Sequence, residues 1–405
     1  SFSALDQDGI IVNSNFQRYQ GKVNLSQKIN DKLTANLLVN YSRTATKGTN
    51  PTAAQQSSSA TGWLMYSVWG YRPARPLSQT GDEDEWLDSI IDSEAASSND
   101  YRFNPAKTVR NEYRRTLVDY MSGNLSLIYQ FTDELKLKVS GAYTTNKRRV
   151  EAFNGSQTYT GYEGSPAGKG INGHIYWYDK ADWLNDYVLT YTKPFAKKHH
   201  LQLVGIFSMQ GQTSDFYGTR AEKMTTEQLG LKGLHTGQYQ TVTPYQYDWR
   251  MMSGALRLNY NYRYKYYLTA SFRADASSKF PKANRVGYFP SASVAWNFNR
   301  EDFLKNSSVL SNGKLRLSWG LTGNNRTTTP YDFYPQITTR PGTQTSFDYV
   351  FDGKNIAGYF PSNLANPTLK WETTAQVNAG VDLAFFEDRI KIVADWYQKD
   401  TRDLL

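Results

Sequence analysis

Seven aromatic residues lie in two segments whose composition suits ligand binding. They are Trp63, Tyr66, Trp69 and Tyr71 in TGWLMYSVWGYRPARP (61–76), and Tyr176, Trp177 and Tyr178 in HIYWY (174–178). Flat apolar rings can stack on sugar rings or on peptide side chains, and small-molecule sites favour aromatic linings with a few polar groups. Aromatic rings are equally common as packing residues. We therefore expect these seven residues to contact a substrate or to anchor their segments against neighbouring protein.

Patterns for catalysis, metal binding or a cofactor are absent from the sequence. It contains no H-E-x-x-H, G-x-S-x-G or P-loop motif. The acidic run GDEDEWLDS (81–89) lacks the spacing of a calcium loop, and the absence of cysteine excludes disulfides and thiolate metal sites. We predict that the protein is not an enzyme, with no catalytic residue, no bound metal and no cofactor.

The composition indicates a folded protein with no helical membrane span. Aromatic residues make up 15% of the chain, whereas disordered chains are poor in them. No apolar run approaches the ~20 residues that a transmembrane helix needs. The net charge of +9 is not concentrated on one helix face, so we expect no nucleic-acid partner. The start SFSALDQDGI lacks the features of a signal peptide, and we expect Ser1 to be a processed or fragment start.

About a dozen segments alternate strictly between apolar and polar residues. In ALRLNYNYRYKYYLTASFR (255–273), Leu256, Leu258 and Tyr260 occupy even positions, and the intervening residues are polar. WETTAQVNAGVDL (371–383) shows the same pattern. Because successive Cβ atoms of a β-strand point to opposite sides, this period of two predicts strands with one face in an apolar medium and the other in water. We predict an all-β, antiparallel protein.

The connections between these segments alternate between long and short. Long outer loops are expected at about 44–116, 146–180, 211–248, 275–287 and 323–370. Successive connections of antiparallel strands lie at opposite ends of a sheet, so all long loops should emerge at one end, as in an outer-membrane barrel. Strands of about ten residues also match the ~25 Å apolar band of such barrels. Large aromatics near strand ends are expected in the interfacial girdles: Trp371, Trp396, Trp296 and Tyr41.

Charged residues on the polar side of these strands are expected to face a hydrated lumen, because Arg or Lys facing lipid at the midplane costs ~2–4 kcal/mol. They are Arg257, Arg263, Arg273, Arg316, Glu372 and Asp382. Two basic clusters at the long-loop end, Arg114-Arg115 and Lys147-Arg148-Arg149, are expected to meet phosphates of outer-membrane lipid and lipopolysaccharide. Ordinary surface solubility is the alternative for these clusters.

Four stretches resemble one protein family and keep its order along the chain. They are DQDGIIVNSNFQRYQGKVNLSQKI (6–29), SFRADASSKFPKANRVGYFPSASVAWNFNREDFL (271–304), KLRLSWGLTGNN (314–325) and NPTLKWETTAQVNAGVDLAFFEDRIKIVADWYQKDTRDLL (366–405). In these stretches the chain resembles the SusC/RagA-type TonB-dependent transporters of the Gram-negative outer membrane.

The resemblance implies a transmembrane β-barrel of about 22 strands, of which residues 1–405 form a central part with about 12 strands. The plug domain, the TonB box and the last strands are expected outside this sequence. The implied partners are a SusD-type lipoprotein lid, TonB acting through the plug, and an oligosaccharide or peptide substrate imported across the cell outer membrane. A dimer of importer-lid pairs is also implied. A passive outer-membrane porin and a soluble all-β carbohydrate-binding protein remain as alternatives.

Overall fold

The computed structural model describes residues 1–49, 64–71, 103–165, 168–196, 198–304, 307–327, 329–339, 349–356 and 359–404. Within these ranges, thirteen strands form one antiparallel sheet in chain order, and two short hairpins lie apart from it. The sheet consists of β1 (Phe2–Asp8), β2 (Asn15–Lys28), β3 (Leu33–Lys47), β4 (Glu112–Gln130), β5 (Leu135–Asn154), β6 (Asn172–Phe195), β7 (His199–Glu222), β8 (Tyr239–Tyr262), β9 (Tyr266–Ser277), β10 (Val286–Asn297), β11 (Leu310–Asn324), β16 (Glu372–Phe385) and β17 (Ile390–Arg402). The all-β, antiparallel prediction is confirmed.

The remaining elements are short and lie in the connections. The hairpins pair β12 (Gln336–Thr339) with β15 (Tyr359–Asn363), and β13 (Tyr349–Phe351) with β14 (Lys354–Ile356). The helical elements are α1 (Leu64–Gly70), α3 (Pro105–Asn111), η2 (Gly230–Thr236), η3 (Lys282–Asn284) and η4 (Phe298–Arg300). Among the described residues, no helix is both long and apolar enough to cross a membrane.

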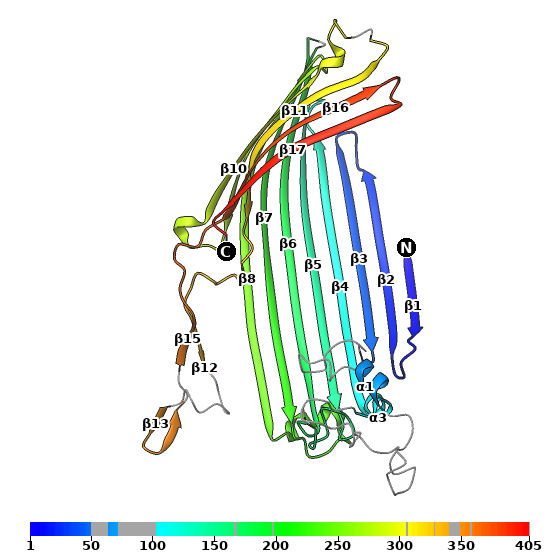
Figure 1. Ribbon diagram of the computed structural model, residues 1–405, viewed down its shortest axis with the longest axis vertical. Coiled ribbons are helices and arrows are strands. Elements are labelled where there is room, and N and C mark those ends of the chain that lie inside the picture. The colour runs from blue at the N-terminus through cyan, green and yellow to red at the C-terminus, as the bar shows by residue number, and fades with distance from the viewer. Residues whose placement is uncertain are drawn as a thin grey trace.

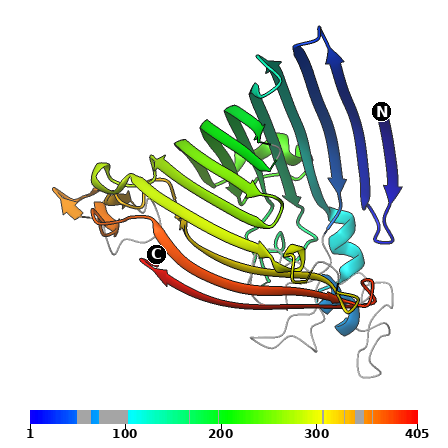
Figure 2. The same ribbon diagram turned by 90° about the horizontal axis from the view of Figure 1, so that it is seen from above.

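The sheet is curved and open, with β1 and β17 as its two edges. Figure 2 shows it bending in an arc from the blue β1 to the red β17. In Figure 1 the short turns, such as the one between β2 and β3, lie at the upper ends of the strands, and the helices α1 and α3 lie at the lower end. The long connections leave from these lower strand ends, as does the short link between β1 and β2, and the assignment of the long loops to the outside stays a prediction.

The strands are longer than the alternation predicts, and two outer loops are correspondingly shorter. β6, β7 and β8 have 24 residues each. The expected loops at about 146–180 and 211–248 were therefore drawn too wide, since they are reduced to the links between β5 and β6 and between β7 and β8. Backbone pairing continues after the alternation of apolar and polar residues has ended, because the ladder depends on backbone groups and not on side-chain type. The exposed edge strand β1 lacks a clear alternation for the same reason and was missed.

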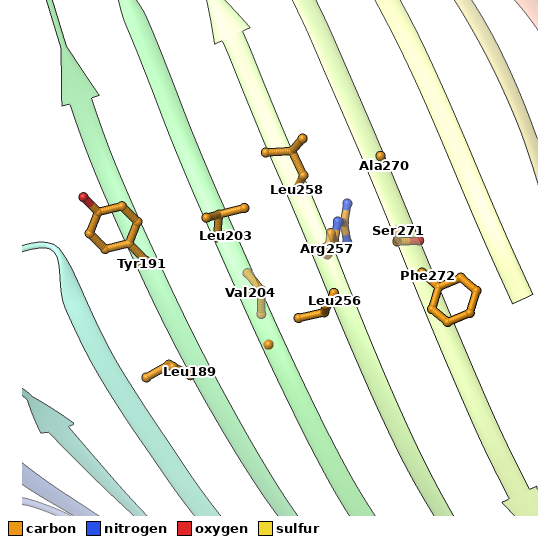
Figure 3. Close-up of a pocket in the computed structure, with 11 residues that line it drawn as sticks. Leu189, Tyr191, Leu203, Val204, Leu256, Arg257, Leu258, Ala270, Ser271 and Phe272 are labelled. Atoms are coloured by element: carbon orange, nitrogen blue, oxygen red, sulfur yellow. The ribbon is translucent and has the colours of Figure 1, made fainter. Parts of the chain in front are cut away.

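The two faces of the sheet differ in side chains. Cross-strand register places one row of four residues on what we call the apolar face: Leu189, Gly205, Leu256 and Phe272. A row on the opposite, polar face consists of Asp186, Ser208, Ser253 and Asp275. Figure 3 shows Leu189, Leu203, Leu256 and Phe272 lining a shallow groove on the apolar face. Leu256 is 69% exposed, whereas Ser253 is 4% exposed. Large apolar side chains turned outward are what a sheet in hydrocarbon requires.

Three of the four predicted girdle aromatics lie on the apolar face, and the fourth does not. Tyr41 and Trp396 are exposed there, and Trp296 lies at the short-turn end. Trp371 is only 7% exposed and packs in a core cluster with Phe280, Phe289 and Leu369. The girdle prediction for Trp371 is wrong because β16 begins one residue later, at Glu372. The indole Nε1 of Trp371 donates instead to the carbonyl oxygen of Arg285, at 3.0 Å.

Candidate functional site

A row of aromatic side chains crosses the polar face near the long-loop end. The register aligns Arg148 of β5 with Tyr178 of β6, Tyr178 with Phe216 of β7, and Phe216 with Tyr245 of β8. The ring of Phe216 lies 4.8 Å from Tyr178 and is stacked on Tyr245 at 4.5 Å, centroid to centroid. Four neighbouring strands thus contribute one row with a cation at its end.

The row extends along the strands in both directions. On β6, Tyr176 lies 5.6 Å from Phe216 and stacks on His174 at 4.3 Å. On β8, Tyr245 contacts Tyr247 at 5.0 Å. We call this continuous set the aromatic arc: His174, Tyr176, Tyr178, Phe216, Tyr245 and Tyr247. The arc is a flat, apolar surface bordered by tyrosine hydroxyls, which suits the stacking of a ligand ring.

The arc lies beyond the part of the sheet that has an apolar outer surface. On β5 the last large apolar residue of the alternating segment is Tyr143, and Arg148 lies five residues further along, or ~16 Å at the usual rise of a strand. At the level of the arc, the opposite face carries charged residues such as Lys147 and Asp179. The arc therefore lies in the part of the wall nearest the long connections.

A glycine allows the rings to pack over the backbone at the centre of the arc. A Cβ at Gly218 would lie 2.9 Å from Cζ of Phe216 and 3.0 Å from Cδ1 of Tyr176, which is too close for real atoms. Phe216 is only 8% exposed, so its ring has little room to move. Tyr245 is 41% exposed and presents the open surface of the arc.

The surroundings of His174 are positively charged. Burial, and to a smaller extent the charges of Arg114, Arg220 and Lys169, together lower the pKa of His174 to about 4. His174 lies near the loop-proximal start of β6, outside the apolar band. It is therefore a neutral ring at physiological pH and acts here as a stacking partner.

Cations lie over rings at two places on this surface. The guanidinium carbon of Arg148 lies 4.2 Å from the ring centroid of Tyr178. Lys279, from the connection between β9 and β10, has its Nζ 4.9 Å from the ring centroid of Trp249. Trp249 shares the polar face of β8 with Tyr247, and it lies opposite Gln212. Such cation–π pairs stabilise by ~0.5–1 kcal/mol at exposed sites.

A second group of polar-face residues lies nearer the short turns and forms ion pairs. Arg316 of β11 donates from Nε and Nη2 to Asp382 of β16, at 3.0 and 2.7 Å, and lies 3.0 Å from Asp395 of β17. Arg273 of β9 donates from Nε to both carboxylate oxygens of Asp275. Arg316 thus ties three strands together, whereas the Arg273–Asp275 pair lies within β9, and the carboxylates of both groups are already occupied.

The charged residues singled out from the sequence have different positions in the structure. Arg257, Arg273, Arg316 and Asp382 lie on the polar face, and Glu372 begins β16. Arg263 does not lie on either face, because β8 ends at Tyr262 and Arg263 occupies the following turn with a φ of 53°. Its guanidinium lies 5.2 Å from the ring of Tyr262. Whether these charges line a lumen remains a prediction.

The predicted aromatic contacts separate into three groups. Tyr176 and Tyr178 belong to the aromatic arc, whereas Trp177 points to the opposite face and lies under Arg149, at 5.5 Å. Tyr66 and Trp69 lie on α1, whose buried Leu64 packs with Phe103, Val109 and Tyr159, and Tyr71 directly follows that helix. Trp69 is 79% exposed. Trp63 and the acidic run 81–89 lie outside the described residues.

Sequence reasoning missed the centre of the arc. Phe216, Tyr245 and Tyr247 fell inside a segment taken as a loop, and Arg148 was assigned to the lipid side. The available signal was the spacing of Tyr245, Tyr247 and Trp249, which alternate with polar residues.

The basic clusters at the long-loop end are divided between the two faces. Arg115, Lys147 and Arg149 share the face of the apolar band, but Arg114 and Arg148 point to the polar face. Arg114 there donates to Asn154 at 2.5 Å and pairs with Glu112. The expectation that all five meet lipid phosphates is wrong, because consecutive residues of a strand point to opposite sides. No group of three or more potential metal ligands was found in the described part of the chain.

Comparisons with known proteins agree with this architecture. A family model described as TonB dependent receptor-like, beta-barrel matches residues 66–405. The TonB-dependent receptor P3 of Formosa agariphila is 28% identical over 401 residues, covering 98% of this chain and 38% of that protein. The TonB-dependent receptor SusC of Bacteroides thetaiotaomicron is 28% identical over 425 residues, covering 100% of this chain and 39% of SusC. The present chain thus spans less than two fifths of the length of these relatives.

Solved structures share the fold. The structure of the RagAB peptide transporter matches with a TM-score of 0.75 and 19% sequence identity, covering 100% of this chain and 42% of that chain. Its closed-closed state gives a TM-score of 0.76. At this level of identity the match concerns the fold of the curved sheet.

Proposed function

Since this chain belongs to the TonB-dependent receptor β-barrel family of the outer membrane, we propose that it forms part of a barrel that imports nutrient oligomers, oligosaccharides or peptides, without altering them chemically. In this proposal, residues 1–405 are one part of a barrel domain of about 22 strands in the cell outer membrane. The apolar face contacts lipid, and the polar face lines the lumen. The aromatic arc contacts the substrate on its way in.

The observation that carries the proposal is the aromatic arc itself. Its rings lie on the polar face, beyond the apolar band and next to the long connections, where a ligand arriving from outside first meets the wall. A surface of aromatic rings binds a ligand through contact area, which suits a ligand that is bound and then released. Catalysis would instead need a nucleophile or an acid-base pair. The names of the relatives are those of receptors, which agrees with a role in binding and import.

The proposed partners follow from the relatives. Similarity to SusC supports a SusD-type surface lipoprotein as a lid and TonB as the source of energy, acting through a plug domain. The shared fold with the RagAB peptide transporter supports peptides as a substrate class, and oligosaccharides are the other class that the family resemblance of the sequence implies. Pairs of importer and lid, contact with lipopolysaccharide at the outer rim, and the lumen-facing role of Arg257 and Glu372 belong to the same proposal.

The test measures uptake by the full-length receptor that contains this chain. Changing both Tyr178 and Tyr245 to Ala should weaken binding of the imported oligomer about tenfold or more, because each stacked ring contributes ~0.5–1.5 kcal/mol. The control is Tyr217→Ala, which removes an exposed ring from the other face of β7. Dissipation of the proton gradient should stop uptake. Unchanged affinity in the double variant would contradict the role of the arc.

A passive porin is the alternative function, because a porin barrel has the same apolar outer face and polar inner face. Liposomes that contain a porin swell in solutions of small sugars, whereas a plugged importer admits little solute by itself. Rapid swelling with the full-length protein would therefore favour the porin and count against active import.

A further inference from the structure

We propose that the aromatic arc selects oligosaccharides that carry an acidic group, a carboxylate or a sulfate, and that Arg148 contacts this group. The inference rests on the proposed function and specifies its substrate class. It starts from the register, which places a guanidinium at the end of a row of three rings, from Arg148 to Tyr245.

Arg148 is exposed and available to an anion. Its guanidinium is stacked on Tyr178 at 4.2 Å, and it forms no ion pair within the described part of the chain. Stacking uses the flat face of the group and leaves its N–H edge open. That edge matches the two oxygens of a carboxylate or a sulfate, which it can bind with two parallel hydrogen bonds.

The nearby carboxylates on the polar face are already paired with other cations. Glu222 lies 2.5 Å from Arg220 and 3.3 Å from Lys169. Asp182 pairs with Lys180 at 3.6 Å and also accepts from Gln212. At the start of β4, Glu112 pairs with Arg114. Each of these carboxylates is therefore paired with a cation and does not repel an anionic ligand. Arg148 adds a positive charge that none of them compensates.

A second cation lies further across the same face. Lys279 stacks on Trp249, four residues along β8 from Tyr245. Arg148 and Trp249 stand on strands three positions apart, a lateral separation of ~14 Å at the usual spacing of strands. An oligosaccharide with acidic groups on more than one sugar can therefore meet both cations while its rings lie along the arc.

The position of the arc on the face of the sheet, away from its strand edges, favours a saccharide over a peptide. Peptides commonly bind a sheet by pairing with an unpaired strand edge. β5, β6 and β7 are paired on both sides at the arc, but β8 is paired there with β7 alone, because β9 pairs with β8 only from Met251 onward. A peptide added to this free edge of β8 would lie in the plane of the sheet, three strands away from Arg148 on β5. The arc offers ring faces, tyrosine hydroxyls and a guanidinium. These groups match the flat face, the hydroxyls and the acidic substituent of a uronic acid or a sulfated sugar.

The test uses matched pairs of probes with the full-length receptor in detergent. Trigalacturonate is compared with its methyl ester, and sulfated neocarratetraose with its desulfated form, so that the members of each pair share one sugar backbone and differ in the acidic group. We expect the acidic member of at least one pair to bind about tenfold more tightly, and this preference to shrink as salt is raised. In Arg148→Gln the preference should fall to less than twofold. Arg148→Lys, which keeps the charge but loses the fork, should retain part of it.

Lys147→Gln is the matched control, because Lys147 is the adjacent exposed cation on the other face. It should leave the preference unchanged. Equal binding of both members in both saccharide pairs, no binding of any saccharide, or a preference that survives in Arg148→Gln would overturn the proposal. A charge preference found only for the peptide Glu-Tyr-Glu over Gln-Tyr-Gln would also overturn it.

Failure of this inference is distinguishable from failure of the proposed function. If a neutral oligomer is imported and the Tyr178 and Tyr245 double variant weakens its binding, the charge selection is wrong and the import role of the arc stands. If the double variant has no effect on any imported oligomer, the proposed role of the arc is wrong as well.

Discussion

The ring of Phe216 lies directly over the backbone of Gly218, two residues further along the same face of β7. A Cβ at Gly218 would stand 2.9 Å from Cζ of Phe216. Gly218→Ala should therefore force the Phe216 ring away from Tyr178 and Tyr245, at a cost of ~1–3 kcal/mol for overpacking. We expect weaker ligand binding with the barrel still assembled, measured by affinity and by heat-dependent migration in gels. Gly254→Ala is the control, because no atom lies within 4 Å of its Cβ position; equal effects would contradict the packing argument.

Leu256 tests which face of the sheet meets lipid. Its side chain is exposed on the apolar face, and an arginine there costs ~2–4 kcal/mol near the membrane midplane. Leu256→Arg should lower the amount of protein assembled in the outer-membrane fraction. Asn259→Arg, on the polar face of the same strand, should be tolerated. If both variants assembled equally well, the assignment of the faces would be wrong.

Arg316 holds two carboxylates together on the polar face. Its removal in Arg316→Met leaves Asp382 and Asp395 close to each other without a cation. We expect a loss of ~1–2 kcal/mol, because the group is partly exposed and screened by water. Thermal unfolding in detergent would measure it. Adding Asp382→Asn and Asp395→Asn should restore most of the stability; no recovery would show that the charges are not the cause.

Glu301 ties together two connections at the short-turn end of the sheet. It accepts from Tyr266 OH at 2.7 Å, Lys265 Nζ at 2.9 Å and Trp296 Nε1 at 3.0 Å, and these donors, with Tyr266 first, lower its pKa to about 2. Because the folded state favours the charged form, this stabilisation is present above the ordinary pKa and is lost as the pH falls toward 2. Glu301→Gln should lower the melting temperature at pH 7.

The same variant should differ less from the parent protein at pH 3 than at pH 7. Asp302→Asn removes a neighbouring exposed carboxylate for which no hydrogen bond or ion pair occurs within the described part of the chain. This control should change the melting temperature little at either pH. A difference between Glu301→Gln and the parent that stays constant with pH would argue against the charge as the cause.

We predict that His174 makes the free energy of unfolding decrease in mild acid. Its pKa is lowered to about 4 in the folded state, so the unfolded chain takes up the proton first as the pH falls below ~6.5. Stability should therefore decrease from pH 6.5 to pH 4, by up to about 3 kcal/mol. His174→Gln should remove this dependence, and His235→Gln, at an exposed position, should not. Melting temperatures across this range would decide it.

Much of the fold could be predicted because apolar and polar residues alternate along each strand, and this alternation identifies its two faces. The segment around Leu256 and Arg257 shows this, since its assignment to two faces is confirmed by the register. The prediction of strand ends failed where the strands extend beyond the apolar band. Beyond the apolar band β6 and β7 no longer alternate between apolar and polar residues, so Phe216 was placed in a loop although its strand continues.

By itself, the sequence determined the class of fold, the two-faced strands and the sorting of long connections to one end, because these depend only on the order of residues along the chain. The tertiary structure decided which rings meet. Tyr178, Phe216 and Tyr245 are far apart in sequence and become neighbours only through the register of two strand pairs. A shift of register by one residue would turn each of them to the other face. The site therefore depends on pairing between strands, which no single segment contains.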